Sequence, residues 1–205
     1  MARPRRLDDT TVLHTAMLTF WRFGFASTGI RELERNLGLK APAIYHRFGS
    51  KEALFQAALQ HYVDTVVTPR VQRHLQHTDT PLAGLRAFFD TTYDYISSEH
   101  PPMACLLLNT SLEALGADPA IASALQRAAD RVRQAFHACL EQAKQCGQLD
   151  SQADSGALAC VLYMGLQGLL VSSKVLRDPA PLRRQTDALF GLLPLFPGNQ
   201  KGDTP

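Results

Sequence analysis

Long apolar runs and paired cysteines are scarce in this chain of 205 residues. The most apolar window, ALACVLYMGLQGLLV, is shorter than the roughly 20 residues of a membrane span, and Gln167 interrupts it. The four cysteines lie far apart without a CxxC pair, which argues against a disulfide framework or a zinc cage. They are Cys105, Cys139, Cys146 and Cys160. We therefore expect no membrane partner and a cytoplasmic protein with reduced thiols.

Motifs of catalysis are missing as well. The sequence has no nucleophile elbow, no phosphate-binding loop, no HExxH and no carboxylate pair with an obvious geometry. His74 and His77 are three residues apart and His137 lies near Cys139, but no third and fourth ligand follow at the spacing of a metal site. We therefore expect that the protein is not an enzyme, binds no metal and has no cofactor.

Strand-like alternation is also absent, whereas apolar residues recur at spacings of three and four, which predicts an all-α fold. The helix pattern predicts a three-helix unit with a helix-turn-helix at 1–52, a helix from about 51 that links the two parts of the chain, and a larger helical region at 53–198. About nine helices are expected, at 8–23, 28–37, 41–48, 51–74, 81–98, 103–115, 119–147, 153–177 and 181–194.

Charge is small overall but unevenly distributed. Residues 1–75 hold 11 Lys and Arg against 6 Asp and Glu, a balance of +5, whereas residues 76–205 hold 10 against 13, a balance of −3. Arg3, Arg5 and Arg6 form a basic arm before the first helix. This asymmetry indicates a polyanion partner at the N-terminal end.

The segment 41–48 has the composition of a helix that reads a DNA groove. Ile44 and Phe48 are expected to point inward at an i, i+4 spacing, which leaves Ala41, Pro42 and Tyr45 on the opposite face. Small residues allow close approach to base edges, and proline can contact a thymine methyl group. Lys40 is the candidate for a guanine contact. Tyr45 and His46 are candidates for phosphate contacts, which set register rather than sequence.

Two further phosphate contacts are expected at helix starts. Lys51 opens the fourth helix, where a cation opposes the macrodipole, and a bound phosphate would compensate for this. Thr28, or Ser27, is expected to cap the second helix and to reach the other edge of the groove. The complete set of predicted DNA contacts is Arg5, Arg6, Thr28, Arg31, Lys40, Ala41, Pro42, Tyr45, His46 and Lys51.

The stretch GFASTGIRELERNLGLKAPAIYHRFGSKEALF resembles the N-terminal domain of the tetracycline-repressor (TetR) family, and the resemblance covers about residues 6–61. It implies a homodimeric transcription regulator, usually a repressor, that a small molecule releases from a palindromic operator. Residues 1–52 would be its DNA-binding domain and residues 53–198 its effector-binding and dimerisation domain. Ala43, Arg31 and Arg35 depart from the family's usual pattern. The resemblance therefore does not supply the operator sequence.

The resemblance further implies that the last two long helices, at about 153–177 and 181–194, form the dimer interface. Gly156, Gly165 and Gly168 would permit close helix approach there, and packing within one chain is the less favoured alternative. A small apolar or amphipathic ligand is expected among the helices at 81–147, although the same residues also fit an ordinary core. Its candidate contacts are Phe88, Phe89, Tyr93, Met103, Cys105, Leu107, Asn109 and Phe136.

Two alternative functions remain open. Cys105 follows Pro101 and Pro102 near a helix start, a position that favours reactivity and would suit a sensor of oxidants or electrophiles. An inert, buried cysteine is the competing interpretation. The other alternative is an architectural or adaptor protein that binds DNA without an effector.

Overall fold

The computed structural model describes residues 8–76, 79–93, 104–113, 118–176 and 178–195. Within these ranges the chain is helical without strands, apart from an isolated bridge between Leu149 and Leu195, so the all-α prediction is confirmed. The helices are α1 (Asp9–Phe23), α2 (Ile30–Leu37), α3 (Ala41–Phe48), α4 (Lys51–Tyr62), the π-helix η1 (Val63–Val67), α5 (Thr68–Leu75), α6 (Pro81–Asp90), α7 (Leu106–Glu113), α8 (Pro119–Gln145), α9 (Ser155–Val175) and α10 (Pro179–Gly191).

The chain divides into two compact units. The first comprises Met1–Val67 and Cys105–Ala128, and the second comprises Thr68–Ala104 and Ala129–Pro205. The division thus differs from the expected boundary after residue 52. Residues 51–67 of the linking helix group with the N-terminal helices, as do α7 and the start of α8, whereas α5 belongs to the second unit.

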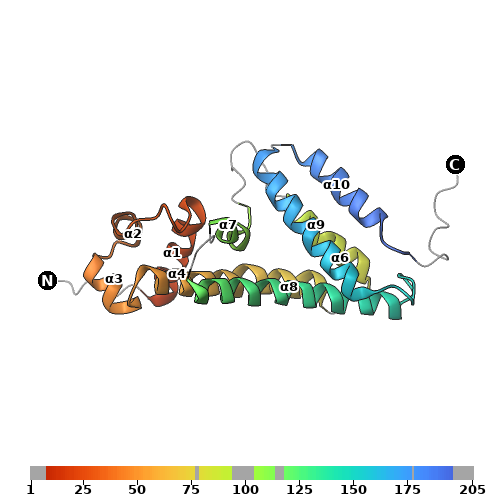
Figure 1. The fold of residues 1–205 in the computed structure, drawn as a ribbon, viewed down its shortest axis with the longest axis horizontal. Helices are drawn as coiled ribbons and strands as arrows, with labels where there is room; N and C mark the ends of the chain where they lie inside the picture. The colour runs from red at the N-terminus through yellow and green to blue at the C-terminus, as the bar shows by residue number, and fades with distance from the viewer. Residues whose placement is uncertain (1–7, 77–78, 94–103, 114–117, 177, 196–205) are drawn as a thin grey trace. The chain divides into compact units, whose positions relative to one another are not determined.

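The core of the first unit is built around α1 and α4, which pack against each other, while α2 contacts α1 and α3 contacts both α2 and α4 (Figure 1). Phe20 of α1 and Phe55 of α4 are almost completely buried, with ring centroids 4.9 Å apart in an edge-on arrangement. Phe25, from the loop after α1, lies 4.7 Å from Phe55. Burial of each such ring stabilises the unit by about 2–3 kcal/mol, which fixes the frame that carries α2 and α3.

The predicted fourth helix at 51–74 contains the π-helical segment η1. Pro69, the second residue of α5, explains this segment. Proline has no N–H to donate, and its ring clashes with the carbonyl four residues earlier, here that of Thr65. A π turn changes the hydrogen-bond pattern just before such a position. The predicted long helix is thus present as an unbroken helical stretch, residues 51–75, with a π-helical turn inside it that the sequence analysis did not predict. The border between the two units falls at the end of this segment.

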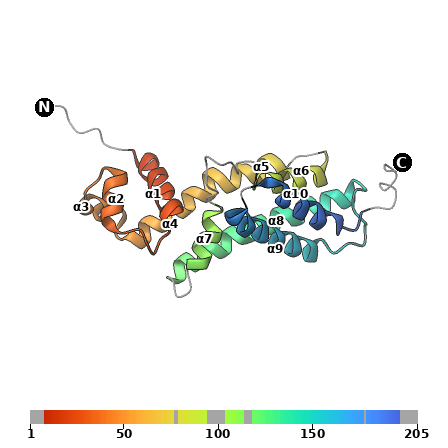
Figure 2. The same cartoon turned by 90° about the horizontal axis from the view of Figure 1, so that it is seen from above.

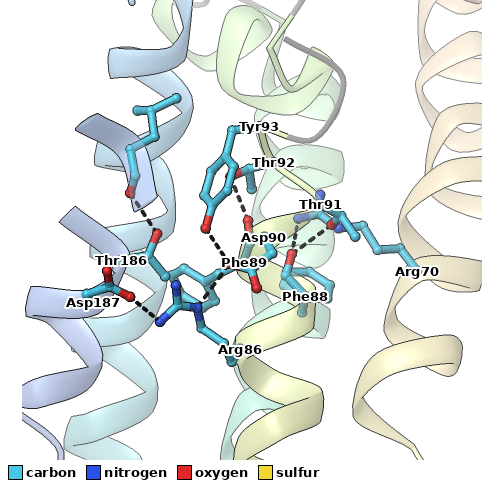
Figure 3. Close-up of polar contacts among 11 residues, drawn as sticks. Arg70, Arg86, Phe88, Phe89, Asp90, Thr91, Thr92, Tyr93, Thr186 and Asp187 are labelled. Atoms are coloured by element: carbon cyan, nitrogen blue, oxygen red, sulfur yellow. Dashed lines mark hydrogen bonds and ion pairs between the residues drawn. The ribbon is translucent and has the colours of Figure 1, made fainter. Parts of the chain in front are cut away.

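In the second unit, α6 contacts α5 and α10, and α9 contacts α10. Arg86 of α6 forms ion pairs with Asp90 on its own helix, at 2.9 Å, and with Asp187 on α10, at 2.6 Å (Figure 3). Tyr93 donates a hydrogen bond to Asp90. Burial of Tyr93, and then this hydrogen bond, raise the pKa of its phenol above the usual value. The ion pair between Arg86 and Asp187 therefore joins α6 to α10, and Asp90 holds Arg86 in place for it.

The helix α9 is longer than the apolar window in the sequence suggested. It has 21 residues, and among the described helices it is the one that could cross a membrane by length and composition. Asp154 caps its start by accepting hydrogen bonds from the N–H groups of Gly156 and Ala157. A β-carbon on Gly165 would lie 2.4 Å from the side chain of Leu189 on α10, so the absence of a side chain there allows α10 to pack closely. The helix is thus one side of a hairpin with α10.

Candidate nucleic-acid interface

The helices α2 and α3 meet at a tight turn. Gly38 ends α2 in the left-handed conformation at φ 65°, and its N–H donates to the carbonyl of Glu34 at 3.0 Å. Residues with a β-carbon rarely adopt this conformation, which is why a glycine stands here. Lys40 is the N-cap of α3, and Pro42 lies in its first turn, where a missing N–H does no harm. The predicted helix-turn-helix is present with the predicted bounds of α3.

Four of the ten predicted DNA contacts lie on α3, namely Ala41, Pro42, Tyr45 and His46. Ile44 is fully buried and Phe48 is half-buried, so α3 faces the core as expected. Tyr45 has 44% of its surface exposed. Pro42, His46, Lys40 and Arg31 are exposed as well, and Ala41 is half-buried. The residues of α2, the turn and α3 thus remain candidates for DNA contact together.

Thr28 and Lys51 are placed differently from expectation. The N-cap of α2 is Gly29, not Ser27 or Thr28, so the predicted side-chain cap was wrong. The Thr28 side chain is buried, and its hydroxyl donates to the carbonyl of Gly24. A hydroxyl that is buried and already bonded does not present itself to a phosphate at the surface.

The ammonium group of Lys51 is used inside the protein. Its Nζ donates to the carbonyls of Phe25 and Thr28, at 3.0 and 3.1 Å, and lies 4.2 Å from the centroid of the Phe25 ring. These carbonyls belong to the loop between α1 and α2. These two hydrogen bonds explain why a lysine stands at the start of α4 without a bound phosphate. The side chain is half-buried, so part of it remains accessible to a phosphate. Ser50 caps α4 as predicted, accepting from the N–H of Ala53 at 3.1 Å.

Three charged residues that support the interface were not predicted from sequence. The Arg47 guanidinium pairs with Asp9 of α1 at 2.5 Å, and so joins α3 to α1. A carboxylate oxygen of Glu34 accepts the N–H of Ala41 at 2.7 Å. Glu113, at the end of α7, accepts the N–H of Ala26 at 3.0 Å.

The Glu113 contact also involves Gly24. This glycine has φ 82°, and a β-carbon on it would lie 2.4 Å from a Glu113 carboxylate oxygen. Gly24 therefore serves both the backbone turn and the approach of α7. Figure 2 shows α7 beside α4, which it contacts. Because Glu113 lies 87 residues from Ala26, no local sequence pattern predicts this hydrogen bond.

The predicted DNA contacts Arg5 and Arg6 lie outside the described residues.

The predicted ligand contacts are divided between the two units. Phe88, Phe89, Tyr93 and Phe136 lie in the second unit and are at most 2% exposed. The Phe136 ring lies 5.3 Å from that of Phe88 and 5.7 Å from that of Phe89, so these side chains form a packed aromatic cluster. Cys105, Leu107 and Asn109 lie half-buried in the first unit. Met103 lies outside the described residues.

Metal-binding groups of three or more His, Cys, Asp or Glu residues are not found in the described part of the chain.

A small three-helix head with an exposed second helix of the helix-turn-helix, joined to a larger helical region, defines a DNA-binding transcriptional regulator. Family models match at both ends of the chain. Residues 12–58 match the model for bacterial regulatory proteins of the tetR family, and residues 81–189 match the tetracyclin repressor-like C-terminal domain. The chain belongs to the TetR family of transcriptional regulators, as the resemblance implied, and is not an enzyme.

Individual relatives match over most of their length. The HTH-type transcriptional repressor ComR of Escherichia coli (strain K12) is 28% identical over 198 residues, which cover 95% of this chain and 91% of ComR. The HTH-type transcriptional regulator YezE of Bacillus subtilis (strain 168) is 26% identical over 194 residues, covering 94% of this chain and all of YezE. Among solved structures, a cysteine mutant of the TetR-family regulator CifR bound to a 26-bp operator has a TM-score of 0.81 at 27% identity, covering 94% of this chain and 100% of that one. The reduced form of E. coli NemR has a TM-score of 0.80 at 21% identity, covering 91% of this chain and 97% of NemR, and shows the shared fold.

Proposed function

We propose that this regulator is a homodimeric repressor that binds a palindromic operator and is released by a small molecule. The observation that carries the proposal is the exposed side of α3. Its residues Pro42, Tyr45 and His46 are exposed together and follow the exposed N-cap residue, Lys40. A helix of this kind is the part of a helix-turn-helix that enters the major groove. The operator-bound CifR structure and the repressor ComR support the same reading.

The dimer is supported by a second exposed surface, on α9. Along one side of this helix, exposed residues that are apolar or small recur at spacings of three and four, and the charged Lys174 is exposed near its end. We call the apolar and small residues the α9 stripe: Ala157, Val161, Met164, Gly168, Val171 and Val175. Met164 is 61% exposed and Val175 is 78% exposed, and a β-carbon on Gly168 would meet nothing within 4 Å. An apolar stripe open to water suits a twofold pairing of helices, which would set two heads about 34–36 Å apart for a palindrome.

Selection of duplexes from a random pool tests DNA binding. The wild-type protein is expected to enrich a palindrome, and its affinity for that duplex should fall steeply with salt because several phosphates are neutralised. Addition of candidate apolar compounds should then release the duplex in a fluorescence anisotropy assay. A dimer that binds no duplex even at low salt would contradict the proposal.

Substitution of Lys51 separates a phosphate contact from an internal role. We expect Lys51→Met to weaken binding to all duplexes, because the carbonyls of Phe25 and Thr28 in the loop before α2 lose their donor, the Lys51 ammonium group. The slope of log affinity against log salt should stay close to that of the wild type. Lys40→Met, the matched change on the exposed surface, should instead alter preference between duplexes. A fall in the Lys51→Met slope by about 1 would show that Lys51 contacts a phosphate directly.

A sensor of oxidants or electrophiles is the second candidate function. Cys105 immediately precedes α7 and accepts the Asn109 N–H on its carbonyl at 2.9 Å, as an N-cap residue does. The Tyr62 hydroxyl lies 3.5 Å from its sulfur, in hydrogen-bonding geometry. The CifR structures carry cysteine substitutions and NemR was solved in a reduced form, which makes cysteine chemistry worth testing in this chain.

Limited labelling with N-ethylmaleimide, read by mass spectrometry, tests this candidate. We expect Cys105 to be labelled before the more exposed Cys146 and Cys160, which serve as reference thiols. Cys139 should stay unlabelled, because burial raises the pKa of its thiol to about 11. Labelling in the order of exposure alone would contradict the proposal that Cys105 is a reactive sensor.

The architectural alternative, in which the protein binds DNA without an effector, would be favoured if no compound released the duplex. The close aromatic packing around Phe136 agrees with this alternative.

A further inference from the structure

The first turn of α3 lacks an ordinary side-chain cap. Lys40 is the N-cap residue, but an ammonium group has no acceptor to offer the N–H groups of the turn. The carbonyl of Lys40 accepts the N–H groups of Ala43 and Ile44, at 2.8 and 3.1 Å. Pro42 has no N–H. This leaves the N–H of Ala41, which needs an acceptor from elsewhere in the chain.

Glu34 supplies that acceptor from the preceding helix. Its Oε1 accepts the Ala41 N–H at 2.7 Å, while its own carbonyl accepts the Gly38 N–H at 3.0 Å. One residue therefore ends α2 with its backbone and begins α3 with its side chain. The turn between the two helices is closed at both ends by the same residue.

We propose that Glu34 is the positioning residue of the recognition helix, and that it determines how well the protein tells one duplex from another. By fixing where α3 begins, the Glu34 carboxylate fixes the direction in which Lys40 and Pro42 face the groove. This inference rests on the proposed function of DNA binding.

The charge of Glu34 points to the same role. A helix N-terminus attracts anions, and a DNA phosphate is the anion that would otherwise settle there. The carboxylate already fills this position beside the Ala41 N–H. The N-terminus of α3 therefore does not bind a DNA phosphate. Its exposed residues can instead contact base edges, which carry the sequence information.

The test compares full-length variants on two duplexes. One is the duplex that the wild-type protein selects from a random pool, and the other is an unrelated duplex of equal length, both measured by fluorescence anisotropy at one salt concentration. The variants are Glu34→Ala, Glu34→Gln, which keeps an acceptor oxygen, and the control Glu32→Ala. Glu32 lies on the same helix, and its carboxylate accepts from the Asn36 side chain at 3.0 Å and pairs with Arg35. Its removal takes away the same charge without touching α3.

We expect Glu34→Ala to lower the ratio of the two affinities by about five- to tenfold, the scale of a lost helix cap. Binding to the unrelated duplex should not weaken, because a negative charge has been removed. Glu34→Gln should keep most of the ratio, and Glu32→Ala should keep all of it. The inference is overturned if Glu34→Ala and Glu32→Ala have the same ratio, or if Glu34→Gln is as poor as Glu34→Ala.

Amide hydrogen exchange gives a check that requires no variant to fold. In the wild-type protein without DNA, the Ala41 N–H should exchange at least about tenfold more slowly than a free amide. Exchange at the rate of a free amide would overturn the inference.

If the wild type binds no duplex, the proposed function itself fails. That result differs from failure of the Glu34 role, in which the wild type discriminates and Glu34→Ala does so equally well.

Discussion

Met164→Glu is expected to convert the proposed dimer to a monomer and to lower operator affinity by more than about a hundredfold. Met164 lies in the middle of the α9 stripe and is 61% exposed in the single chain. A twofold axis through the stripe would bring the two introduced carboxylates into one apolar contact, where charges without partners are strongly unfavourable. A monomer presents one recognition helix, which reads half a palindrome. Light scattering coupled to size-exclusion chromatography gives the mass, and anisotropy gives the affinity.

The matched control is Gln134→Glu. Gln134 is exposed on α8, in the same unit, so the substitution adds the same charge outside the stripe. We expect it to remain dimeric and to bind the operator as the wild type does. If Met164→Glu is dimeric at micromolar concentration and binds the operator with unchanged affinity, the α9 stripe is not the interface.

Phe89→Ala is expected to lower the free energy of unfolding by about 3–5 kcal/mol, the usual cost of such a deletion in a close-packed core. Phe89 is fully buried, and its ring lies 5.7 Å from that of Phe136 and 5.2 Å from that of Phe190. The three rings come from α6, α8 and α10. Truncation would therefore leave a cavity among three helices. Urea denaturation followed by circular dichroism measures the loss.

Phe23→Ala provides the comparison, because it deletes the same side chain from a position that is 42% exposed. We expect it to cost no more than about 1 kcal/mol, since little apolar surface is lost from the interior. Equal losses for the two variants would mean that the aromatic cluster is not tightly packed. A cluster that yields so easily would suit a ligand pocket better than a rigid core.

The local features of the head could be predicted from sequence because short-range chemistry determines them. Gly24 ends α1, Gly38 ends α2 and Ser50 caps α4, each as expected from residue type. The inward face of α3 followed from the spacing of Ile44 and Phe48. The exposed residues of α3 followed in turn, because the opposite side of an amphipathic helix faces away from the core.

Features that depend on residues distant in sequence could not be predicted. The loop between α1 and α2 draws its partners from α4 and α7, through Lys51 and Glu113. Because a single sequence does not show which side chains meet across such distances, Lys51 was assigned to a phosphate alone. The effect of Pro69 was missed for a different reason. The apolar spacing continues through the proline, so the periodicity alone predicted one helix.

That spacing explains what the π-helical segment does for the chain. Buried residues recur every four positions at Leu59, Val63, Val67, Val71 and Leu75. Four residues of a regular α-helix turn through about 400°, so a strict repeat of four drifts by about 40° at each step, or about 160° over the whole series. In the π-helical segment Val63–Val67 the hydrogen bonds join residues five positions apart, so the backbone turns through a smaller angle per residue. This smaller angle cancels part of the drift. One simple sequence repeat can in this way supply apolar side chains to two separate cores.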